Sequence, residues 1–224
     1  MILAVDIGNT NVTCGVYDGE KWVHTLRLSS TLNFWNQFST LKEFDITECA
    51  ISSVVPNLIQ VYIESIRNLF QVDAHIITCQ NSGVELLVET PQDVGIDRIC
   101  NTAATNLLVG TPAIVGDIGS ATNYDVVDEN GAFIGGAIAP GIKVAAHNLI
   151  EKAALLNETA FIVPESAVGK NTETNLQSGI MLGAIDVVDG MFTRIMGEMN
   201  WEKCNMIVTG GFGGLIAPHL EIKH

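Results

Sequence analysis

The sequence predicts an α/β fold made of two duplicated subdomains. The tripeptide Asp-Ile-Gly occurs at residues 6–8 and again at residues 117–119, separated by almost half of the 224-residue chain. Each copy follows an apolar run typical of a buried strand and precedes small polar residues, a second apolar stretch and an Asx-Gly pair. Strand and helix patterns alternate in both halves, which indicates the α/β class. An isolated Asp-x-Gly turn is common, so the tripeptide by itself does not indicate a duplication. The matching flanks and the half-chain offset of the two copies are what favour a duplicated fold.

The first half is expected to have the order β-β-β-α-β-α-β. Its predicted strands span residues 2–5, 12–17, 22–28, 48–55 and 75–78. Asp18-Gly19 suits a two-residue hairpin turn, because both residue types tolerate positive φ. Residues 56–70 begin with proline and repeat apolar side chains at i, i+3/i+4 spacing, which predicts an amphipathic helix. Residues 29–44 show no clear period and predict only a weak helix.

The second half repeats the β-turn-β-turn-β unit, with Asn130-Gly131 as its predicted hairpin turn. Its predicted strands span residues 113–115, 124–127, 132–139 and 205–208. Its predicted helices span residues 142–156 and 174–199. A further helix, predicted at residues 97–108, connects the two halves. We expect an N-terminal subdomain of residues 1–106 and a C-terminal subdomain of residues 107–224 that is short at its C-terminus.

The composition is that of a globular chain. Hydrophobic residues make up 47% of the sequence and the mean hydropathy is +0.31, which is ample for a substantial core. No stretch approaches the ~18 apolar residues of a membrane span and no secretory signal is evident, so we expect a soluble, cytoplasmic protein without a membrane partner. The five cysteines lack metal-ligand spacing, which favours reduced thiols.

The charge balance excludes one class of partner. With 25 acidic against 11 basic residues and an isoelectric point near 4.5, most of the surface would repel a polyanion. The sequence therefore argues against direct binding to nucleic acid. A small anionic ligand remains compatible with this charge if backbone amides, helix ends or metal ions supply a local positive field.

The first Asp-Ile-Gly copy has the residues of a phosphate-binding turn. Gly8 would let an oligophosphate approach the main chain closely, and Asn9, Thr10 and Asn11 add hydrogen-bond donors. The Asp6 carboxylate would repel a phosphate directly. Its expected role is therefore to hold a hydrated Mg²⁺ that bridges to the nucleotide.

Two further turns extend this pattern. The second copy offers Gly119, Ser120 and Thr122 for the same purpose, with Asp117 as a second carboxylate for a cation. A Gly-rich turn at residues 209–214 follows the last predicted strand and suits close contact with a nucleotide base or ribose. One Gly-rich turn is weak evidence by itself. Three such turns at strand ends together predict a nucleotide cleft.

Seven short motifs occur along the chain in a fixed order. They are Asp6-Ile7-Gly8-Asn9-Thr10-Asn11, Ser52-Ser53-Val54-Val55-Pro56, Gly95-Ile96-Asp97-Arg98, Asp117-Ile118-Gly119-Ser120-Ala121-Thr122, Gly135-Gly136-Ala137-Ile138-Ala139-Pro140-Gly141, Gly169-Lys170-Asn171-Thr172 and Thr209-Gly210-Gly211. From residue 1 to about residue 218, the chain thereby resembles the type III pantothenate kinase family of the actin-like phosphotransferase superfamily. The resemblance implies two actin-like, ribonuclease H-like subdomains with an ATP cleft between them. It also implies a homodimer that phosphorylates pantothenate to 4'-phosphopantothenate, the first step of coenzyme A synthesis.

The resemblance also implies individual roles, with ATP as the phosphate donor. The implied ATP-binding residues are Asp6, Ile7, Gly8, Asn9, Thr10, Asn11, Val12, Thr13, Ser120, Thr122, Gly210 and Gly211. Asp117 would bind the K⁺ or NH₄⁺ that the family requires, and Asp6 would hold Mg²⁺, directly or through water. The implied pantothenate-binding residues are Gly95, Ile96, Asp97, Arg98, Thr172 and Val88.

The chemistry of phosphoryl transfer supports Asp97 as the base. The transition state is loose, so a carboxylate mainly orients the attacking hydroxyl and takes its proton late. Arg98 can pair with the carboxylate of pantothenate through two parallel hydrogen bonds. A surface ion pair or a helix cap would explain an isolated Asp-Arg pair. The Gly-x-Asp-Arg frame shortly before Asp117 favours the catalytic interpretation.

Two other functions remain open from the sequence. One is a nucleotide-binding accessory or regulatory protein with weak or absent catalysis. The other is a related kinase for another small alcohol, which Val88 favours because this position is often aromatic in the family. Asn123 also departs from the family, which usually has threonine there, whereas Ser120 keeps the hydroxyl of the usual threonine.

Overall fold

The chain forms two compact units in a computed structural model that describes residues 1–153 and 155–222. Unit 1 comprises Met1–Gly83 and Thr90–Cys100. Unit 2 comprises Val84–Glu89 and Asn101–His224. Helix α3 (Ile96–Leu108) supplies its first residues to unit 1 and the remainder to unit 2. The predicted boundary between residues 106 and 107 lies within this helix and stays a prediction.

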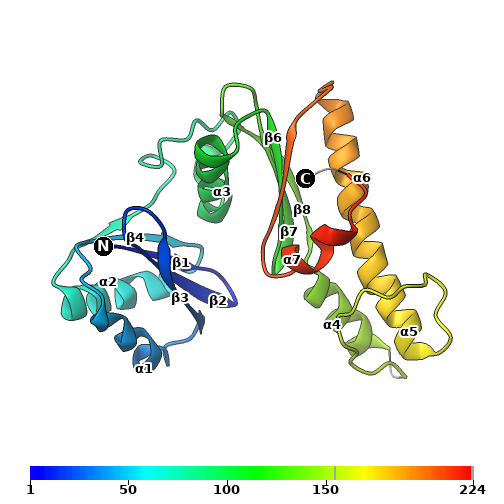
Figure 1. Cartoon of the computed structure of the whole chain (residues 1–224), viewed down its shortest axis with the longest axis horizontal. Coiled ribbons are helices and arrows are strands. Elements are labelled where there is room, and N and C mark those ends of the chain that lie inside the picture. The colour runs from blue at the N-terminus through cyan, green and yellow to red at the C-terminus, as the bar shows by residue number, and fades with distance from the viewer. Residues whose placement is uncertain (154, 223–224) are drawn as a thin grey trace. The chain divides into compact units, whose positions relative to one another are not determined.

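Unit 1 is built on a five-stranded mixed sheet with the strand order β3-β2-β1-β4-β5. The strands are β1 (Ile2–Ile7), β2 (Asn11–Tyr17), β3 (Trp22–Ser29), β4 (Glu48–Ser53) and β5 (Ala74–Ile76). The first three pair antiparallel, while β4 and β5 continue the sheet parallel to β1. Helices α1 (Trp35–Phe38) and α2 (Pro56–Phe70) cover one face (Figure 1).

Alternation along the strands separates the core of unit 1 from its other face. Leu3, Val5 and Ile7 of β1 are fully buried, whereas Ala4 and Asp6 point to the opposite side, because successive side chains of a strand alternate. The buried face packs against α1 and α2 in one apolar cluster. The first Asp-Ile-Gly aspartate is therefore directed away from the core and remains available for a polar site.

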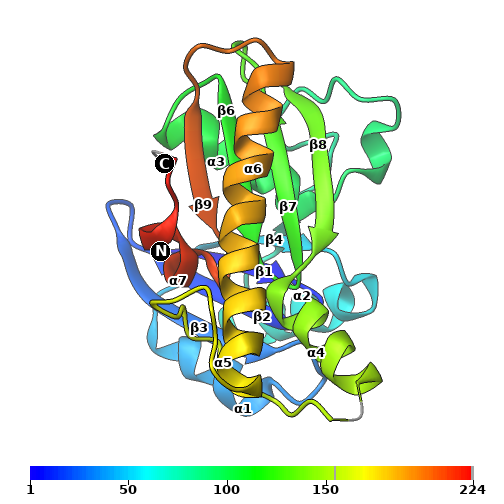
Figure 2. The same cartoon turned by 90° about the vertical axis from the view of Figure 1, so that its right-hand side faces the viewer.

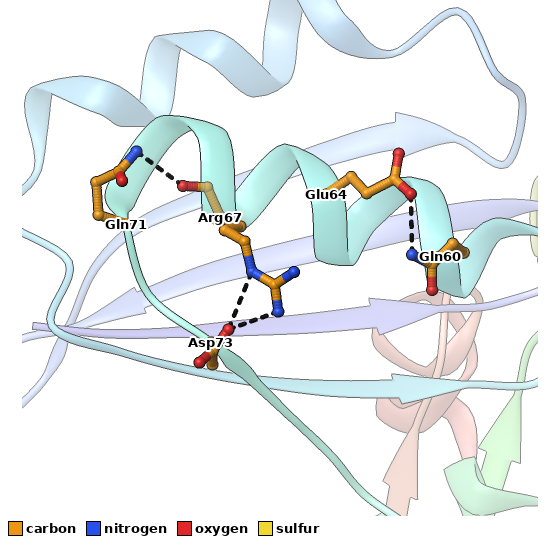
Figure 3. Close-up of polar contacts among 5 residues, drawn as sticks. All are labelled: Gln60, Glu64, Arg67, Gln71 and Asp73. Atoms are coloured by element: carbon orange, nitrogen blue, oxygen red, sulfur yellow. Dashed lines mark hydrogen bonds and ion pairs between the residues drawn. The ribbon is translucent and has the colours of Figure 1, made fainter.

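Polar contacts fix the exposed side and the end of α2 (Figure 3). Gln60 Nε2 donates to Glu64 Oε1 at 2.9 Å, one turn along the helix. Beyond the last turn, Gln71 has a φ of 59°, and its Nε2 donates to the carbonyl oxygen of Arg67 at 3.1 Å. Arg67 donates to Asp73 Oδ1 through Nε at 3.1 Å and Nη2 at 2.7 Å. Both side chains are largely exposed, so this ion pair contributes less than about 1 kcal/mol.

Unit 2 is built on a four-stranded mixed sheet with the strand order β8-β7-β6-β9. The strands are β6 (Ala113–Ile118), β7 (Ala121–Val127), β8 (Phe133–Pro140) and β9 (Asn205–Thr209). The helices are α4 (Ile142–Lys152), α5 (Thr172–Gln177), α6 (Gly183–Glu198) and α7 (Gly213–Ile216), with a π-helical segment, Ser178–Leu182, between α5 and α6. Helix α6 runs along one face of the sheet (Figure 2).

A glycine on the central strand lets α6 pack closely on the sheet of unit 2. A Cβ atom at Gly116 would lie 3.0 Å from the ring of Phe192, which projects from α6 and is fully buried. Phe192 meets Tyr124 of β7 edge-on, with ring centroids 6.0 Å apart. Edge-to-face aromatic pairs of this kind add to the free energy gained by burial. The sheet and α6 therefore form the core beneath the second aspartate-bearing turn.

The predicted duplication is confirmed by the strand pairing. Asp6 on β1 is the register partner of Ser52 on the parallel strand β4. Asp117 on β6 is the register partner of Thr209 on the parallel strand β9. In both units the aspartate-bearing strand also pairs antiparallel with the strand that follows it. Each aspartate therefore lies near the carboxyl end of a central strand, with a hydroxyl-bearing residue directly beside it.

The two aspartate-bearing turns differ in length. Residues 8–10 connect β1 to β2, whereas only residues 119–120 connect β6 to β7. The first glycine of each turn donates its amide hydrogen across the turn, to the Asn11 carbonyl at 3.0 Å in unit 1 and to the Ala121 carbonyl at 2.8 Å in unit 2. The first turn therefore presents one more residue than the second.

The two predicted hairpin turns are longer than expected. Residues 18–21 connect β2 to β3, and residues 128–132 connect β7 to β8. The aspartate that begins each connection accepts hydrogen bonds from two later backbone amides through Oδ1, which stabilises a wider turn. Gly19 and Gly131 have φ values of 107° and 85°. The expected positive φ is thus present at the two glycines and not at Asp18 or Asn130, and the predicted two-residue length is wrong.

The predicted helices are present, and apart from α2 (Pro56–Phe70) their bounds differ from those expected. The weak helix predicted at residues 29–44 is limited to α1 and a 3₁₀ turn, in keeping with the missing apolar period. The helix predicted at residues 142–156 is α4, which ends at Lys152, and residue 154 lies outside the described residues. The helix predicted at residues 174–199 is the continuous run from α5 to α6. In the described part of the chain, no helix is both long and apolar enough to cross a membrane.

Candidate active site

The first aspartate-bearing turn is held in place by the end of β3. The Ser30 hydroxyl donates to the carbonyl oxygen of Gly8 at 2.5 Å, and the Ser30 amide donates to the carbonyl oxygen of Thr10 at 3.1 Å. Asn9 and Thr10 are exposed at the tip of the turn. The turn is therefore fixed at both ends while its middle faces outward, as a backbone anion site requires.

The predicted ATP-binding residues of unit 1 fall into two environments. The turn residues and Thr13 of β2 are at least partly accessible. Ile7 and Val12 are fully buried in the core. Their side chains cannot contact a ligand, so any contribution of these two residues would come through the main chain. The Ser30 side chain, which was not among the residues predicted from the sequence, does contact the turn through the Gly8 carbonyl.

Asp6 lies in a polar cluster with Ser52, Asp97 and Cys100. The Ser52 hydroxyl donates to Asp6 Oδ1 at 2.7 Å. Burial raises the pKa of Asp6, the hydrogen bond from Ser52 lowers it, and the negative charge of Asp97 raises it. Burial and the Asp6 charge also raise the pKa of the Cys100 thiol, while Ser52 lowers it. The structure therefore brings the predicted Mg²⁺ carboxylate and the predicted base together within unit 1.

This cluster borders an open cavity on the face of the sheet opposite the core. The cavity has a volume of about 400 Å³ and includes Asp6, Ser52 and Cys100 in its lining. Trp22 lines it as well and packs over Gly15, where a Cβ atom would lie 2.7 Å from the indole ring. The small residue at that strand position therefore makes room for the indole.

Asp97 occupies the first turn of α3. Its Oδ1 accepts a hydrogen bond from the backbone amide of Arg98 at 3.0 Å, and that bond leaves Oδ2 unused. A Cβ atom at Gly95 would lie 2.5 Å from Asp97 Oδ1, so a side chain there would displace the Asp97 carboxylate from its present position. The backbone amides of a helix N-terminus favour a carboxylate at this place. Gly95, Ile96, Asp97 and Arg98 thus lie together at the start of α3, and the side chain of Ile96 is buried.

Val88 belongs to a different unit from Asp97. It lies in the segment Val84–Glu89, which is part of unit 2. This segment is attached there by a parallel bridge between Leu86 and Phe133 and by the bond from the Leu87 amide to the Phe133 carbonyl at 2.9 Å. A substrate role for Val88 stays a prediction.

In unit 2 the Asp117 carboxylate is surrounded by a helix and two glycine turns. Asn101 Nδ2 on α3 donates to Asp117 Oδ2 at 3.2 Å. A Cβ atom at Gly119 would lie 3.6 Å from Asp117 Oδ1, and one at Gly210 would collide with the same oxygen. The Gly-rich turn after β9 is tied to this place by the Phe212 amide, which donates to the Ile118 carbonyl at 2.9 Å. Within unit 2, the turns at Gly119 and Gly210 therefore both lie beside Asp117.

The other predicted ATP contacts of unit 2 have unequal exposure. Ser120 is exposed in the turn after β6, and Gly211 is exposed in the turn after β9. Thr122 is only 5% exposed. Gly141, before α4, packs against the turn so tightly that a Cβ atom would lie 2.5 Å from the Ser120 carbonyl oxygen. The accessible hydroxyl is thus that of Ser120, while direct ATP contact by Thr122 stays a prediction.

Thr172 lies apart from Asp117, at the start of α5. Its helix begins with a capping box in which Asn171 Oδ1 accepts the Thr174 amide at 2.9 Å and the Thr174 hydroxyl interacts with the Asn171 backbone. Thr172 is exposed and lines an open cavity of about 420 Å³ together with Thr159. The side-chain oxygen of Thr159 is buried there without a hydrogen-bond partner. The cavity thus combines an exposed hydroxyl with an unsatisfied buried one.

A second cavity of unit 2 is apolar. It has a volume of about 530 Å³ and lies between α4 and the helical run from α5 to α6. Leu149, Ile180 and Val187 are among its lining residues, and Leu149 and Val187 are 48% and 52% exposed. Glycines of the α5–α6 run, including Gly179 and Gly183, also line it. Large apolar side chains remain accessible along this groove.

The surroundings of the two aspartates differ. Among residues 1–153 and 155–222, no three His, Cys, Asp or Glu side chains are grouped to hold a metal ion. Mg²⁺ is commonly held by one or two carboxylates, with phosphate oxygens and water completing its shell, and Asp6 with nearby Asp97 suits this mode. At Asp117 the absence of side chains at Gly119 and Gly210 lets two backbone turns approach Oδ1 closely. A monovalent ion at Asp117 stays a prediction.

Two solved structures share the fold. A Campylobacter jejuni protein assigned to the Baf family of transcriptional activators aligns with 98% of this chain and 88% of its own, at a TM-score of 0.58 and 22% identity. A Sinorhizobium meliloti protein described as a 2-dehydro-3-deoxygalactonokinase aligns with 100% of this chain and 98% of its own, at a TM-score of 0.55 and 12% identity. Together with the repeated aspartate-bearing turns, these matches define the chain as a duplicated α/β protein of the actin-like class.

The sequence comparisons narrow this class to one family. The model of the type III pantothenate kinase family matches residues 2–194. The type III pantothenate kinase of Thermomicrobium roseum is 40% identical over 230 residues, which cover 97% of this chain and 88% of the relative. That of Moorella thermoacetica is 38% identical over 233 residues, which cover 99% of this chain and 91% of the relative. The chain belongs to the type III pantothenate kinase family, as its seven motifs predicted.

Proposed function

We propose that the protein transfers the γ-phosphoryl group of ATP to the primary hydroxyl of pantothenate, giving 4'-phosphopantothenate for coenzyme A synthesis. Membership of the type III pantothenate kinase family is the observation that carries this proposal. The unit 1 cluster supports it, because Asp6 and Asp97 place two carboxylates beside an accessible backbone turn. The accessory-protein alternative does not require this pairing. The cytoplasmic location expected from the sequence stays a prediction.

Asp97 acts in this proposal as the base that orients the pantothenate hydroxyl. One carboxylate oxygen is fixed by the Arg98 amide, so the carboxylate is held while Oδ2 can accept the substrate proton. Arg98 supplies a planar guanidinium, whose charge and geometry suit the pantothenate carboxylate. Because the transition state is loose, most of the rate would come from this positioning and from cations near the phosphates.

Two cations complete the proposed site. Asp6 would hold Mg²⁺, which when bound neutralises phosphate charge during transfer. Asp117 would hold K⁺ or NH₄⁺, and the two glycine turns support that assignment because they place main-chain groups close to its Oδ1. The exposed turns at residues 8–10 and 119–120 would supply backbone donors for ATP.

The active form in this proposal is a homodimer that pairs through unit 2. The apolar groove beside α4 supports the pairing, because Leu149 and Val187 would be shielded from water by a second copy. Light scattering on a sizing column measures this directly. A dimer mass is expected, and a strictly monomeric chain at micromolar concentration would contradict it.

The decisive test measures ATP consumption with pantothenate, with and without K⁺ or NH₄⁺. Asp97→Asn keeps the shape of the side chain and removes its basicity. We expect this variant to lose turnover while retaining ATP binding, because Asp97 contributes to the transfer step and not to the nucleotide site. Asp93→Asn is the matched control, because Asp93 is an exposed carboxylate in the 3₁₀ turn just before α3. Full activity in Asp97→Asn would remove Asp97 as the base.

Val88 favours one alternative, a kinase for another small alcohol. Valine presents no aromatic face to a substrate, whereas the family often has an aromatic residue at this position. A panel of acceptors that share a primary hydroxyl and an anionic group, measured at equal concentration, separates the two proposals. Turnover of another alcohol with a higher kcat/KM than pantothenate would replace pantothenate as the substrate. ATP binding without transfer to any acceptor would favour the accessory role.

A further inference from the structure

Ser52 has no role in the proposed reaction so far, although it contacts Asp6 directly. It lies on β4, where it is the register partner of Asp6 on the parallel strand β1. Its hydroxyl donates to Asp6 Oδ1 at 2.7 Å, a length typical of a strong bond to a carboxylate. The contact joins neighbouring strands and is therefore built into the sheet.

The hydrogen bond from Ser52 restricts the orientation of the Asp6 carboxylate. The terminal torsion of an aspartate side chain is broad, so an unrestrained carboxylate samples many orientations. A hydroxyl has a single hydrogen to donate, and Ser52 gives it to Oδ1. The orientation of the whole carboxylate is thereby restricted, and Oδ2 remains outside this bond.

Cys100 on α3 lies close to this pair. Ser52, Asp6 and Cys100 line the same cavity of unit 1, and the Ser52 hydroxyl lowers the pKa of the Cys100 thiol while the Asp6 charge raises it. The contact between Ser52 and Asp6 therefore faces the cavity and not the apolar core.

The neighbouring serine has a separate task. The Ser53 hydroxyl accepts the Val55 amide at 3.0 Å and contacts the Val55 carbonyl at 3.2 Å, at the entrance to α2. Side chains alternate along a strand, so the two serines of this motif point to opposite faces of the sheet. The contacts at the entrance to α2 thus account for the hydroxyl of Ser53, but they do not involve the hydroxyl of Ser52.

We propose that Ser52 is a positioning residue for the Mg²⁺–nucleotide complex: its hydroxyl fixes the Asp6 carboxylate so that Oδ2 stays available to the cation. The proposal rests on the proposed function, which supplies the Mg²⁺–ATP. Residues that orient a metal-binding carboxylate in this way typically change metal affinity or activity by about 10- to 100-fold when removed. Ser52 acts through Asp6 and has no contact with the transferred group.

The test compares three variants in the full chain. Ser52→Ala removes the donor, and Ser52→Thr restores it with a residue that the equivalent position of the second unit already accommodates as Thr209. Ser65→Ala is the matched control, because the buried Ser65 hydroxyl also makes one hydrogen bond, to the Val61 carbonyl at 2.7 Å within α2, away from Asp6. Thermal unfolding of each variant shows whether the fold is retained.

Binding of Mn²⁺ with a non-hydrolysable ATP analogue, followed by electron paramagnetic resonance, gives a readout without catalysis. We expect Ser52→Ala to weaken Mn²⁺ binding by about 10-fold, with Ser52→Thr close to the native chain and Ser65→Ala unchanged. In turnover assays the KM for Mg²⁺–ATP should rise in Ser52→Ala while the KM for pantothenate stays the same. Native affinity for Mn²⁺ in folded Ser52→Ala would overturn the inference.

The outcomes separate this inference from the proposed function. A native chain that binds Mn²⁺ with the nucleotide but phosphorylates no acceptor overturns the proposed function, while the binding comparison still decides the role of Ser52. A native chain that transfers phosphate and is matched by Ser52→Ala in metal and nucleotide affinity overturns the inference alone. A native chain that binds no Mn²⁺ with the nucleotide overturns both.

Discussion

Asn101 on α3 and Asp117 at the end of β6 are joined by a hydrogen bond, with Asn101 Nδ2 3.2 Å from Asp117 Oδ2. The amide contacts Oδ2, whereas the two glycine turns approach Oδ1 of the same carboxylate. Sequence reasoning did not select Asn101. The contact makes the proposed monovalent-cation site dependent on a residue of the connecting helix.

Replacement of Asn101 by alanine is expected to weaken the response to the monovalent cation. Without the amide, the Asp117 carboxylate loses one of its fixed contacts, and the concentration of K⁺ or NH₄⁺ needed for half-maximal activity should rise by about 10-fold. A titration of ATP turnover against KCl measures the change. Asn106→Ala is the control, since Asn106 on the same helix donates instead to the Gly131 carbonyl at 2.8 Å. An unchanged cation response in Asn101→Ala would contradict the role of this contact.

Gly210→Ala is expected to destabilise unit 2. Gly210 has a φ of 88°, and a Cβ atom there would lie 2.6 Å from the backbone of Ile118 and collide with the Asp117 carboxylate. Strain in this backbone region alone lowers the free energy of unfolding by about 1–3 kcal/mol. Gly214→Ala is the control, because no atom lies within 4 Å of a Cβ atom at that position. Chemical denaturation should show a lower midpoint for Gly210→Ala only, and equal midpoints would contradict the packing described here.

Two buried thiols are expected to make the protein sensitive to alkali. Burial raises the pKa of Cys14 from 9.0 to about 12, with smaller contributions from Cys49 and Asp6, and burial likewise raises the pKa of Cys49 to about 12. Above pH 9 the unfolded chain releases these protons while the native chain keeps them. The free energy of unfolding should therefore fall between pH 9 and 12, by about 1.4 kcal/mol per pH unit for each thiol.

Denaturation at a series of pH values measures this slope. Cys14→Ala with Cys49→Ala should flatten it, even though the loss of packing lowers stability at neutral pH. Cys79→Ala is the matched control, because Cys79 is only partly buried and lies outside the apolar cluster of unit 1. A slope that is unchanged in the double variant would show that other groups cause the alkaline transition.

The sequence predicted those parts of the fold that depend on local pattern. The apolar run of β1 identified a buried strand that ends near Asp6, and the proline-led period of α2 gave the bounds Pro56 to Phe70 that the structure shows. Turn lengths were not predictable in the same way. Asp18 and Asp128 stabilise longer turns through side-chain contacts to backbone amides, which the Asx-Gly pairs do not reveal.

The site was predictable where the chemistry lies in one short motif. Asp6, Asp97 and Asp117 were selected from their local frames, and the structure places the first two in one cluster. Ser30 and Asn101 were missed, because their contacts depend on which strands and helices become neighbours in space. One signal pointed to Asn101, since it lies one helical turn after Asp97 and would share its face of α3.

The two residue ranges that α3 joins limit where the chain can be divided into fragments. The chain passes between the two units after Gly83, after Glu89 and after Cys100, so neither unit is one continuous stretch. A fragment that ends within α3 would carry Leu86 without its bridge partner Phe133. A circularly permuted version is better opened in the exposed turn at residues 18–21, where the cut interrupts no strand or helix and leaves α3 intact.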